Sequence, residues 1–322
     1  MGFPLVPLND FDALEAYAFA GAKEVYVGFY DDEWVQAFGE LADINRMSGF
    51  KRAANAYTLE EVLAVVPYVH GLGMRMAVTF NAAAYSAEQS DFVAACMQRL
   101  AYAGVDGVIV SVPELVAPAR ANHLEVSAST VCGIYNAATA RFYADAGAQR
   151  LILPRDLSLG EIREIVAAVP EVDYELFMMR NGCIYSDCHC LGMHGLDCGA
   201  LCGEARQAQR TLRASANMEA FEETSDLYFE RFHAHACGLC ALWDLEQLGV
   251  SAYKVVGRSD DVEAICTDVG LVSRNVAIAR ECKSREEYLR AMEGNPWPDI
   301  VCDKGLNCYY PELWELRRTF SK

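Results

Sequence analysis

The sequence of 322 residues predicts a parallel (β/α)8 barrel of the TIM-barrel type, with a cysteine-rich insertion after the seventh strand and a C-terminal tail. Two patterns carry this prediction. Short apolar, β-branched runs alternate with longer segments of helical period, as βα units do. Eight such runs are present, and nearly continuous apolar strands between helices indicate a parallel sheet covered on its outer face. Eight right-handed units favour closure into a barrel.

Seven predicted strands precede the cysteine-rich segment and one follows it. They span residues 3–8, 24–29, 75–81, 107–112, 125–130, 150–155, 173–180 and 252–258. Asn9 or Asp10 caps the first helix, which ends at Gly21. Residues 30–58 are less regular. The later predicted helices span residues 59–73, 87–103, a stretch after Pro113, 136–146, 158–169 and 239–248.

One barrel with two additions accounts for the chain. Residues 1–180 hold units one to seven, 181–238 the cysteine-rich loop and insertion, 239–265 unit eight, and 266–322 a helical and aromatic tail. One helical stretch lies near 218–232, inside the insertion. Because barrel enzymes place their sites at the carboxyl ends of the strands, the loop after the seventh strand is expected on the functional face.

Composition excludes several classes of protein. Hydrophobic residues make up 53%, enough for a core and too many for intrinsic disorder. The net charge of −18 repels a polyanion wherever no local basic patch covers the approach, which argues against direct nucleic-acid binding by the isolated chain. No apolar run reaches the roughly 18 residues of a membrane span, and no signal peptide is evident after Met1. We expect a soluble cytoplasmic protein.

The 13 cysteines are unusually many for a protein expected in a reducing compartment, where thiols indicate metal or redox chemistry. Four of them are scattered singly and are expected to be buried structural thiols: Cys96, Cys132, Cys266 and Cys282. The others gather in a cluster and in one C-x2-C pair: Cys183, Cys188, Cys190, Cys198, Cys202, Cys237 and Cys240. Cys302 and Cys308 lie in the tail.

Three kinds of site fit this spacing. An iron-sulfur cluster needs four thiolates that converge from loops. Zinc would favour close pairs such as Cys188/Cys190 or Cys198/Cys202 with Cys237/Cys240. The zinc ligands could also include nitrogen from His189, His194, His233 or His235. A redox dithiol at Cys237 and Cys240 is the third alternative.

Several blocks of the sequence resemble peptidase family U32, also called the collagenase-like proteases. They are AGAKEVYVGF at 20–29, GVDGVIVSVPELV at 104–116, the segment 126–162 and LGVSAYKVVGRSDDVEAI at 248–265. The blocks follow one another in the family's order over about residues 3 to 265. The resemblance implies a barrel-like α/β domain with a [4Fe-4S] cluster on four cysteines. It also implies oxygen-independent hydroxylation, which better understood members support on a ubiquinone precursor, transfer RNA or ribosomal RNA.

Matched to the family's pattern, the C-x6-C after the seventh strand is Cys183 and Cys190, and the third ligand is Cys202. The fourth is Cys237 or Cys240. This chain departs from the usual YSGRC at residues 185–190, where it has an extra cysteine and no arginine. Cys198 could therefore replace Cys202, and Cys188 could be a spare thiol or a ligand.

Three functions follow from the resemblance. The leading interpretation is an anaerobic redox enzyme that hydroxylates a small aromatic or isoprenoid-type substrate. The alternatives are a peptidase and a non-catalytic, cluster-bearing partner of a second U32-family chain in a hetero-oligomer. The sequence has no G-x-S-x-G or H-E-x-x-H motif to support proteolysis.

Polar residues at the strand ends are candidates for substrate binding. Cationic and amide donors there would suit an anionic small molecule. The candidates are Asn81, Arg155, Arg180 and Arg258. In the tail, a metal site at Cys302 and Cys308 would need partners elsewhere, so we expect Tyr309, Tyr310 and Trp314 to form an aromatic packing segment or a partner interface.

Overall fold

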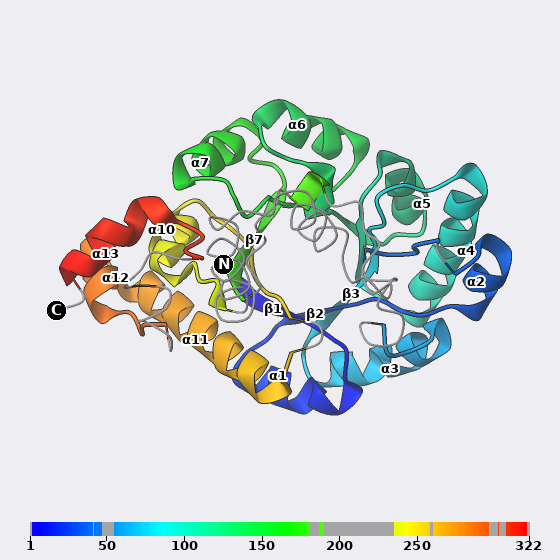
Figure 1. The fold of residues 1–322 in the computed structure, drawn as a ribbon, viewed down its shortest axis with the longest axis horizontal. Helices are drawn as coiled ribbons and strands as arrows, with labels where there is room; N and C mark the ends of the chain where they lie inside the picture. The colour runs from blue at the N-terminus through cyan, green and yellow to red at the C-terminus, as the bar shows by residue number, and fades with distance from the viewer. Residues whose placement is uncertain are drawn as a thin grey trace, which may run out of the picture.

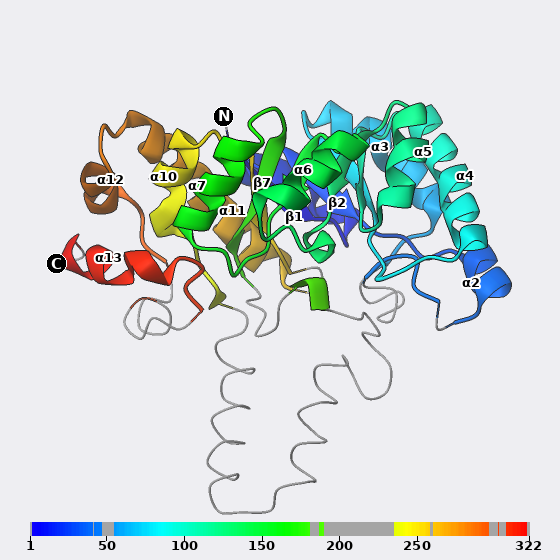
Figure 2. The same cartoon turned by 90° about the horizontal axis from the view of Figure 1, so that it is seen from above.

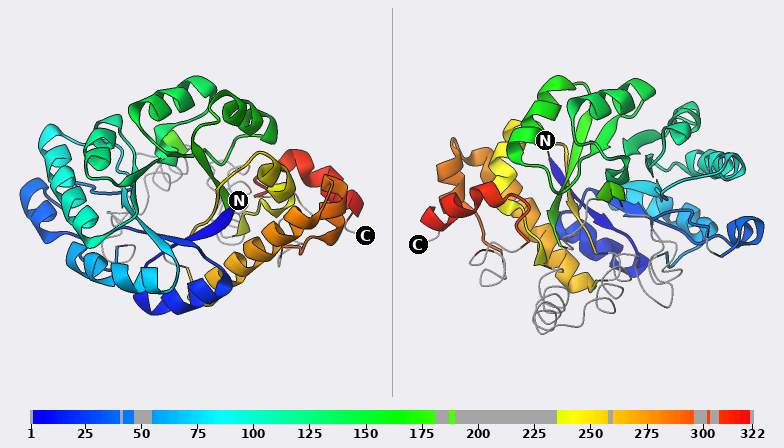
Figure 3. Two further views of the ribbon diagram at one scale, coloured as in Figure 1. Left: turned by 180° about the vertical axis from the view of Figure 1, so that it is seen from behind. Right: turned by 45° about the horizontal axis from the view of Figure 1, so that its top comes forward.

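The structure is a computed structural model that describes residues 2–40, 42–46, 55–180, 187–189, 235–257, 260–295, 302 and 307–320. Within these ranges, eight parallel strands form one closed barrel in chain order, and helices surround it (Figure 1). Figure 3 shows the same ring from behind. The barrel closes between its first and last strands, where Phe3 is opposite Ala252. The predicted fold class is confirmed.

The strands are short and almost wholly buried. Several end earlier than predicted because the chain turns away from the sheet; Ser129, for example, caps a 3-10 turn over Thr130–Cys132. The bounds are β1 Phe3–Pro7, β2 Glu24–Val27, β3 Arg75–Phe80, β4 Gly107–Val110, β5 Glu125–Ala128, β6 Arg150–Ile152, β7 Asp173–Met179 and β8 Ala252–Val255.

The helices between the strands begin and end largely where capping signals predict. Ser86 caps α4 and forms a capping box with Gln89, and Gly104 ends the helix in a left-handed conformation. The bounds are α1 Leu14–Ala20, α2 Asp32–Phe38, α3 Leu59–Gly71, α4 Ala87–Ala103, α5 Val116–Ala121, α6 Ala137–Ala146, α7 Leu159–Ala168, α10 Leu242–Gln247, α11 Val262–Glu281, α12 Arg285–Ala291 and α13 Trp314–Phe320.

Two helical regions differ from the prediction. Helix α2 lies in the stretch that was predicted to be irregular. Asp31 caps it, but Trp34 is its one buried residue, so the sequence shows no apolar periodicity there. The predicted helix 239–248 is a 3-10 turn, η8 (Leu239–Ala241), followed by α10. The helical stretch expected near 218–232 lies outside the described residues.

The C-terminal helices extend the barrel on one side. Helix α11 packs against β1, α1 and α10, so it completes unit eight and continues past residue 265. Helices α12 and α13 lie outside the ring, beside α10 and α11 (Figure 2). No described helix is both long and apolar enough to cross a membrane.

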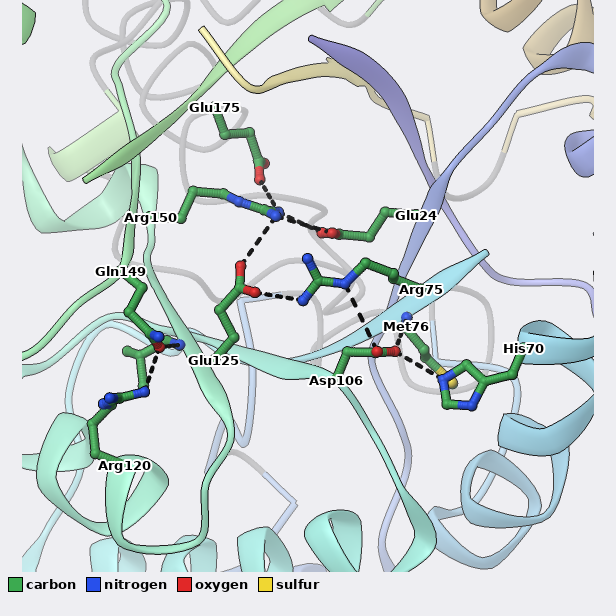
Figure 4. Close-up of polar contacts among 11 residues, drawn as sticks. Glu24, His70, Arg75, Met76, Asp106, Arg120, Glu125, Gln149, Arg150 and Glu175 are labelled. Atoms are coloured by element: carbon green, nitrogen blue, oxygen red, sulfur yellow. Dashed lines mark hydrogen bonds and ion pairs between the residues drawn. The ribbon is translucent and has the colours of Figure 1, made fainter. Parts of the chain in front are cut away.

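The amino ends of the strands carry a buried ion network (Figure 4). Arg150, which is 2% exposed, contacts Glu24 at 2.5 Å, Glu125 at 3.1 Å and Glu175 at 3.5 Å. Lys254 donates to Glu175 at 2.7 Å. The network fastens five strands to one another at the end of the barrel opposite the loops that carry function in this fold.

Candidate site at the carboxyl ends of the strands

A buried carboxylate marks the carboxyl-terminal end of the barrel. Asp187 opens the short 3-10 turn η5 (Asp187–His189), and it is 0% exposed. Arg46 Nη1 donates to Asp187 Oδ1 at 2.9 Å, and Arg155 Nε donates to Oδ2 at 2.8 Å. Thr130 Oγ1 donates to Oδ2 at 3.2 Å. The turn is therefore fastened to the residues that follow β5 and β6.

Two guanidinium groups keep Asp187 charged. Burial raises the pKa of this carboxyl, but the Arg155 and Arg46 guanidiniums outweigh burial and hold the pKa below its usual range. Asp187 is therefore ionised at neutral pH. Its carboxylate accepts hydrogen bonds from both arginines at the mouth of the barrel.

The surroundings of the two arginines hold them in place. The Arg155 guanidinium lies over the Phe177 ring, with Cζ 4.0 Å from the ring centroid, and its side chain is 10% exposed. The Arg46 backbone N–H donates to Asn81 Oδ1 at 3.1 Å. Asn81, expected to bind substrate, thus also fixes the loop that carries Arg46.

Arg180 follows β7 in a left-handed backbone conformation, with φ of 69°. Its backbone N–H donates to the Ala236 carbonyl at 2.8 Å. Its guanidinium donates to Asp268, and to Asp260 at 3.1 Å. Burial raises the pKa of Asp268 to about 6 in spite of the opposing effect of Arg180. Two carboxylates therefore accept hydrogen bonds from this arginine.

The structure places some of the predicted site residues and not others. Asn81, Arg155 and Arg180 all lie at the carboxyl ends of the strands, as expected, and their role in binding substrate stays a prediction. Four predicted residues lie outside the described ranges: Arg258, Cys183, Cys190 and Cys202. Cys198 also lies outside them.

Of the five cysteines in the segment 183–202, Cys188 is the one that lies within the described residues. It lies in η5, next to Gly133 of the loop after β5. A Cβ added to Gly133 would lie 3.1 Å from the Cys188 Cβ and 3.6 Å from its Sγ, and Gly133 has a φ of 64°. The close approach therefore depends on glycine at position 133.

Cys237 and Cys240 lie at a different place in the described structure. Together with Cys302 and Cys308 they line one cavity, whose described lining does not include Cys188. Burial raises the pKa of the Cys240 thiol to about 12 and that of Cys308 to about 11. Among the residues that the structure describes, no group of three or more His, Cys, Asp or Glu side chains could hold a metal ion.

Sequence reasoning missed Arg46 and Asp187. Both lie in loops, where no periodicity signals a contact. One signal was available in the sequence. An acidic residue lies inside the cysteine cluster, and Thr130, Arg155 and Arg180 follow the fifth, sixth and seventh strands.

Comparison with known proteins identifies the family. A model of peptidase family U32 matches residues 9–295. The chain belongs to peptidase family U32. The solved structure of a U32 peptidase has a TM-score of 0.52 with 13% identity, over 80% of this chain and 93% of that chain, which shows the shared fold.

Curated relatives of this U32 chain are named for RNA hydroxylation. The tRNA hydroxylation protein P1 of Bacillus subtilis (strain 168) is 23% identical over 317 residues, 91% of this chain and 71% of that protein. The tRNA hydroxylation protein P of Escherichia coli (strain K12) is 32% identical over 143 residues, 42% of this chain and 30% of that protein. The 23S rRNA 5-hydroxycytidine C2501 synthase of Escherichia coli (strain K12) is 27% identical over 225 residues, 67% of this chain and 33% of that protein. The U32 chain thus matches about a third of the length of the last two.

Proposed function

We propose that this U32-family protein supports oxygen-independent hydroxylation of a base in RNA, with a [4Fe-4S] cluster held by Cys183, Cys190 and Cys202 and by a fourth thiolate from Cys237 or Cys240. The observation that carries the proposal is the burial of Asp187 between Arg46 and Arg155. It fastens the turn that lies between Cys183 and Cys190 in the sequence over the carboxyl ends of the strands. Barrel enzymes bind substrate at that end.

The described part of the cysteine segment fits a bound cluster. Cys188 is placed against Gly133, where a side chain would fill the space, and Asp187 fastens the turn through Arg46 and Arg155. The resemblance assigns Cys183, Cys190 and Cys202 as ligands, with Cys237 or Cys240 as the fourth. When bound, the cluster would supply one-electron transfer. Hydroxylation replaces a C–H bond by C–OH and removes two electrons from the substrate. Without O2, the reaction needs another source of the oxygen atom, such as water, and an external acceptor for the two electrons.

The residues of the chain would bind and orient the substrate. Arg46 and Arg155 carry guanidinium groups of the kind that bind phosphate, and Asn81 fixes the loop of Arg46. The relatives named for tRNA and rRNA hydroxylation support RNA as the substrate. The net charge of −18 supports a second candidate, a small anionic aromatic or isoprenoid-type molecule, because it limits RNA contact to this local spot or to a partner chain.

Gene deletion in the anaerobic host distinguishes these substrates. We expect one hydroxylated nucleoside to disappear from tRNA or rRNA when it is measured by mass spectrometry. Wild-type protein and a Cys96→Ser variant, altered at a buried thiol of α4, should restore it, and Cys190→Ser should not. Loss of a hydroxylated metabolite with unchanged RNA would show that the substrate is the small molecule. Peptide cleavage by purified protein that survives removal of iron would contradict the redox function.

A further inference from the structure

A cavity of about 350 Å³ adjoins the candidate site. Its described lining comes from three segments that are far apart in the sequence: 155–161 after β6, Ala236 before the C-x2-C pair, and 307–312 in the tail. Arg155, which pairs with Asp187, belongs to this lining. The cavity therefore lies beside the mouth of the barrel, where the proposed function places the substrate.

Hydrogen bonds hold the tail in place on one side of the cavity. The Cys237 N–H donates to the Asn307 carbonyl at 3.1 Å, and the Tyr309 N–H donates to the Cys237 carbonyl at 2.9 Å. This parallel bridge sets Cys237 opposite Cys308. The Tyr309 hydroxyl donates to the Arg180 carbonyl at 2.6 Å. The tail wall is thus held by the protein itself, as in a largely pre-formed ligand pocket.

The tail also contacts the first turn of α7 on the other side of the cavity. Glu312 Oε1 accepts a hydrogen bond from the Leu159 N–H at 2.7 Å. Ser158 and Glu161 form a capping box at the same turn. Within the described ranges Glu312 makes no other hydrogen bond, so its Oε2 remains available as an acceptor for a ligand.

The charge of the lining disfavours an anionic group inside the cavity. The described lining carries the carboxylates of Asp156, Glu161 and Glu312 and the guanidinium of Arg155. That guanidinium already donates to Asp187. The three acidic residues are exposed, so a ligand can reach them from solvent. They would repel an anion, whereas a neutral ligand with N–H donors would find acceptors.

We propose that this cavity binds the target base of the RNA and favours a base with an exocyclic amino group, such as cytosine. The inference rests on the proposed function. Carboxylates accept hydrogen bonds from the cytosine amino group, and Glu312 supplies such an acceptor. Tyr309 in the lining supplies an aromatic ring on which an unstacked base can stack.

The size and position of the cavity fit one base. Enzymes that modify a base take it out of its stack into a pocket. Pockets for small ligands measure about 300 to 1,000 Å³, so this cavity has room for one nucleoside and not for a paired helix. Ala236 precedes Cys237, a candidate cluster ligand, so a base bound here lies near the C-x2-C pair. Its phosphate would stay outside, near Arg155.

Ligand-detected NMR of full-length protein purified without oxygen tests the inference. Cytidine and uridine are a matched pair of probes, since C4 carries an amino group in cytidine and a carbonyl in uridine, and neither has a phosphate. We expect wild type to bind cytidine about fivefold or more tightly than uridine. Glu312→Gln should remove this preference, because glutamine also donates to a carbonyl. Glu315→Gln, at an exposed residue of α13 outside the lining, should keep it.

A second pair of variants tests the cavity without a change of charge. Tyr309→Phe keeps the aromatic ring and should keep cytidine binding. Tyr309→Leu should weaken it about fivefold or more, because stacking on the ring is lost. Equal cytidine binding by the two variants would show that the base does not stack on Tyr309 and would overturn its place in this cavity.

Other outcomes also overturn the inference. They are equal binding of cytidine and uridine by wild type, binding of neither, and an unchanged preference in Glu312→Gln. Tighter binding of benzoate, an aromatic anion, would overturn it in favour of the small anionic substrate. Cytidine binding by wild type, with RNA hydroxylation unchanged on gene deletion, would count only against the proposed function. Loss of a hydroxylated nucleoside on deletion, with no cytidine binding, would count only against this cavity.

Discussion

Arg155 Nε donates to Asp187 Oδ2 across 2.8 Å and so joins the end of β6 to the turn η5. The turn lies between Cys183 and Cys190 in the sequence, and Arg46 donates to the same carboxylate from the loop after α2. One buried aspartate therefore connects the cysteine segment to two sides of the barrel mouth. The proposed function depends on this connection.

Replacement of Asp187 by asparagine should release the cysteine segment. Asp187→Asn removes the counter-ion of two guanidinium groups, and breaking a buried ion pair costs about 3 to 5 kcal/mol. We expect the iron content per chain to fall several-fold, with little change in the far-UV circular dichroism of the barrel. Asp145→Asn is the matched control, since Asp145 pairs with Arg141 but is 69% exposed. Equal iron in Asp187→Asn and wild type would refute the anchoring role.

Alanine substitutions at Gly133 and Gly104 separate the effect of backbone strain from the effect of contact with Cys188. Both have positive φ, but a Cβ at Gly133 meets Cys188, whereas a Cβ at Gly104 meets nothing within 4 Å. Alanine at either position should lower the free energy of unfolding by about 1 kcal/mol. Only Gly133→Ala should also lower the iron content. An equal loss of iron from both variants would show that the contact between residue 133 and Cys188 does not affect iron binding.

The buried network at the other end of the barrel should govern stability and not activity. Arg150→Met leaves Glu24 and Glu175 buried without their shared cation, and we expect a loss of about 3 to 5 kcal/mol in urea unfolding. Arg99→Met, which removes an exposed pair with Glu60, should cost less than about 1 kcal/mol. A large loss of iron per folded molecule in Arg150→Met would contradict this separation of roles.

Stability should depend on pH through Asp268. Its folded-state pKa of about 6 is above the ordinary value of 3.8, so the folded state binds the proton more tightly than the unfolded state. The stabilisation is complete below pH 3.8 and is lost as pH rises through about 6. Urea unfolding from pH 4 to 8 should show this decline in wild type and a weaker one in Asp268→Asn. Identical slopes for the two proteins would exclude Asp268 as the source.

The barrel was predictable because its signal is local. Each βα unit repeats an apolar run and a helical period, and α4 has the predicted bounds because Ser86 and Gly104 define both of its ends. Helix α2 was missed because a short helix with one buried residue has no period. Charges at the first residues of strands, such as Glu24 and Arg150, are visible in the sequence. Their pairing across the barrel depends on closure, which no local pattern records.

The candidate site was predictable only in part, for a similar reason. Residues that follow strands, such as Arg155 and Arg180, lie where the fold class places them. Arg46 and Asp187 meet through two loops far apart in the chain, and their contact depends on the complete barrel. The partners of Cys302 and Cys308 likewise follow from a long-range bridge to Cys237, whose register cannot be read from spacing.

Iron, sulfide and zinc analysis of protein purified without oxygen, combined with Mössbauer spectroscopy, tests the central claim most directly. The claim is that the cysteines at 183–202, with Cys237 or Cys240, hold a [4Fe-4S] cluster. It predicts about four iron and about four inorganic sulfide per chain and a spectrum of a cubane cluster. Stoichiometric zinc with no inorganic sulfide would contradict it.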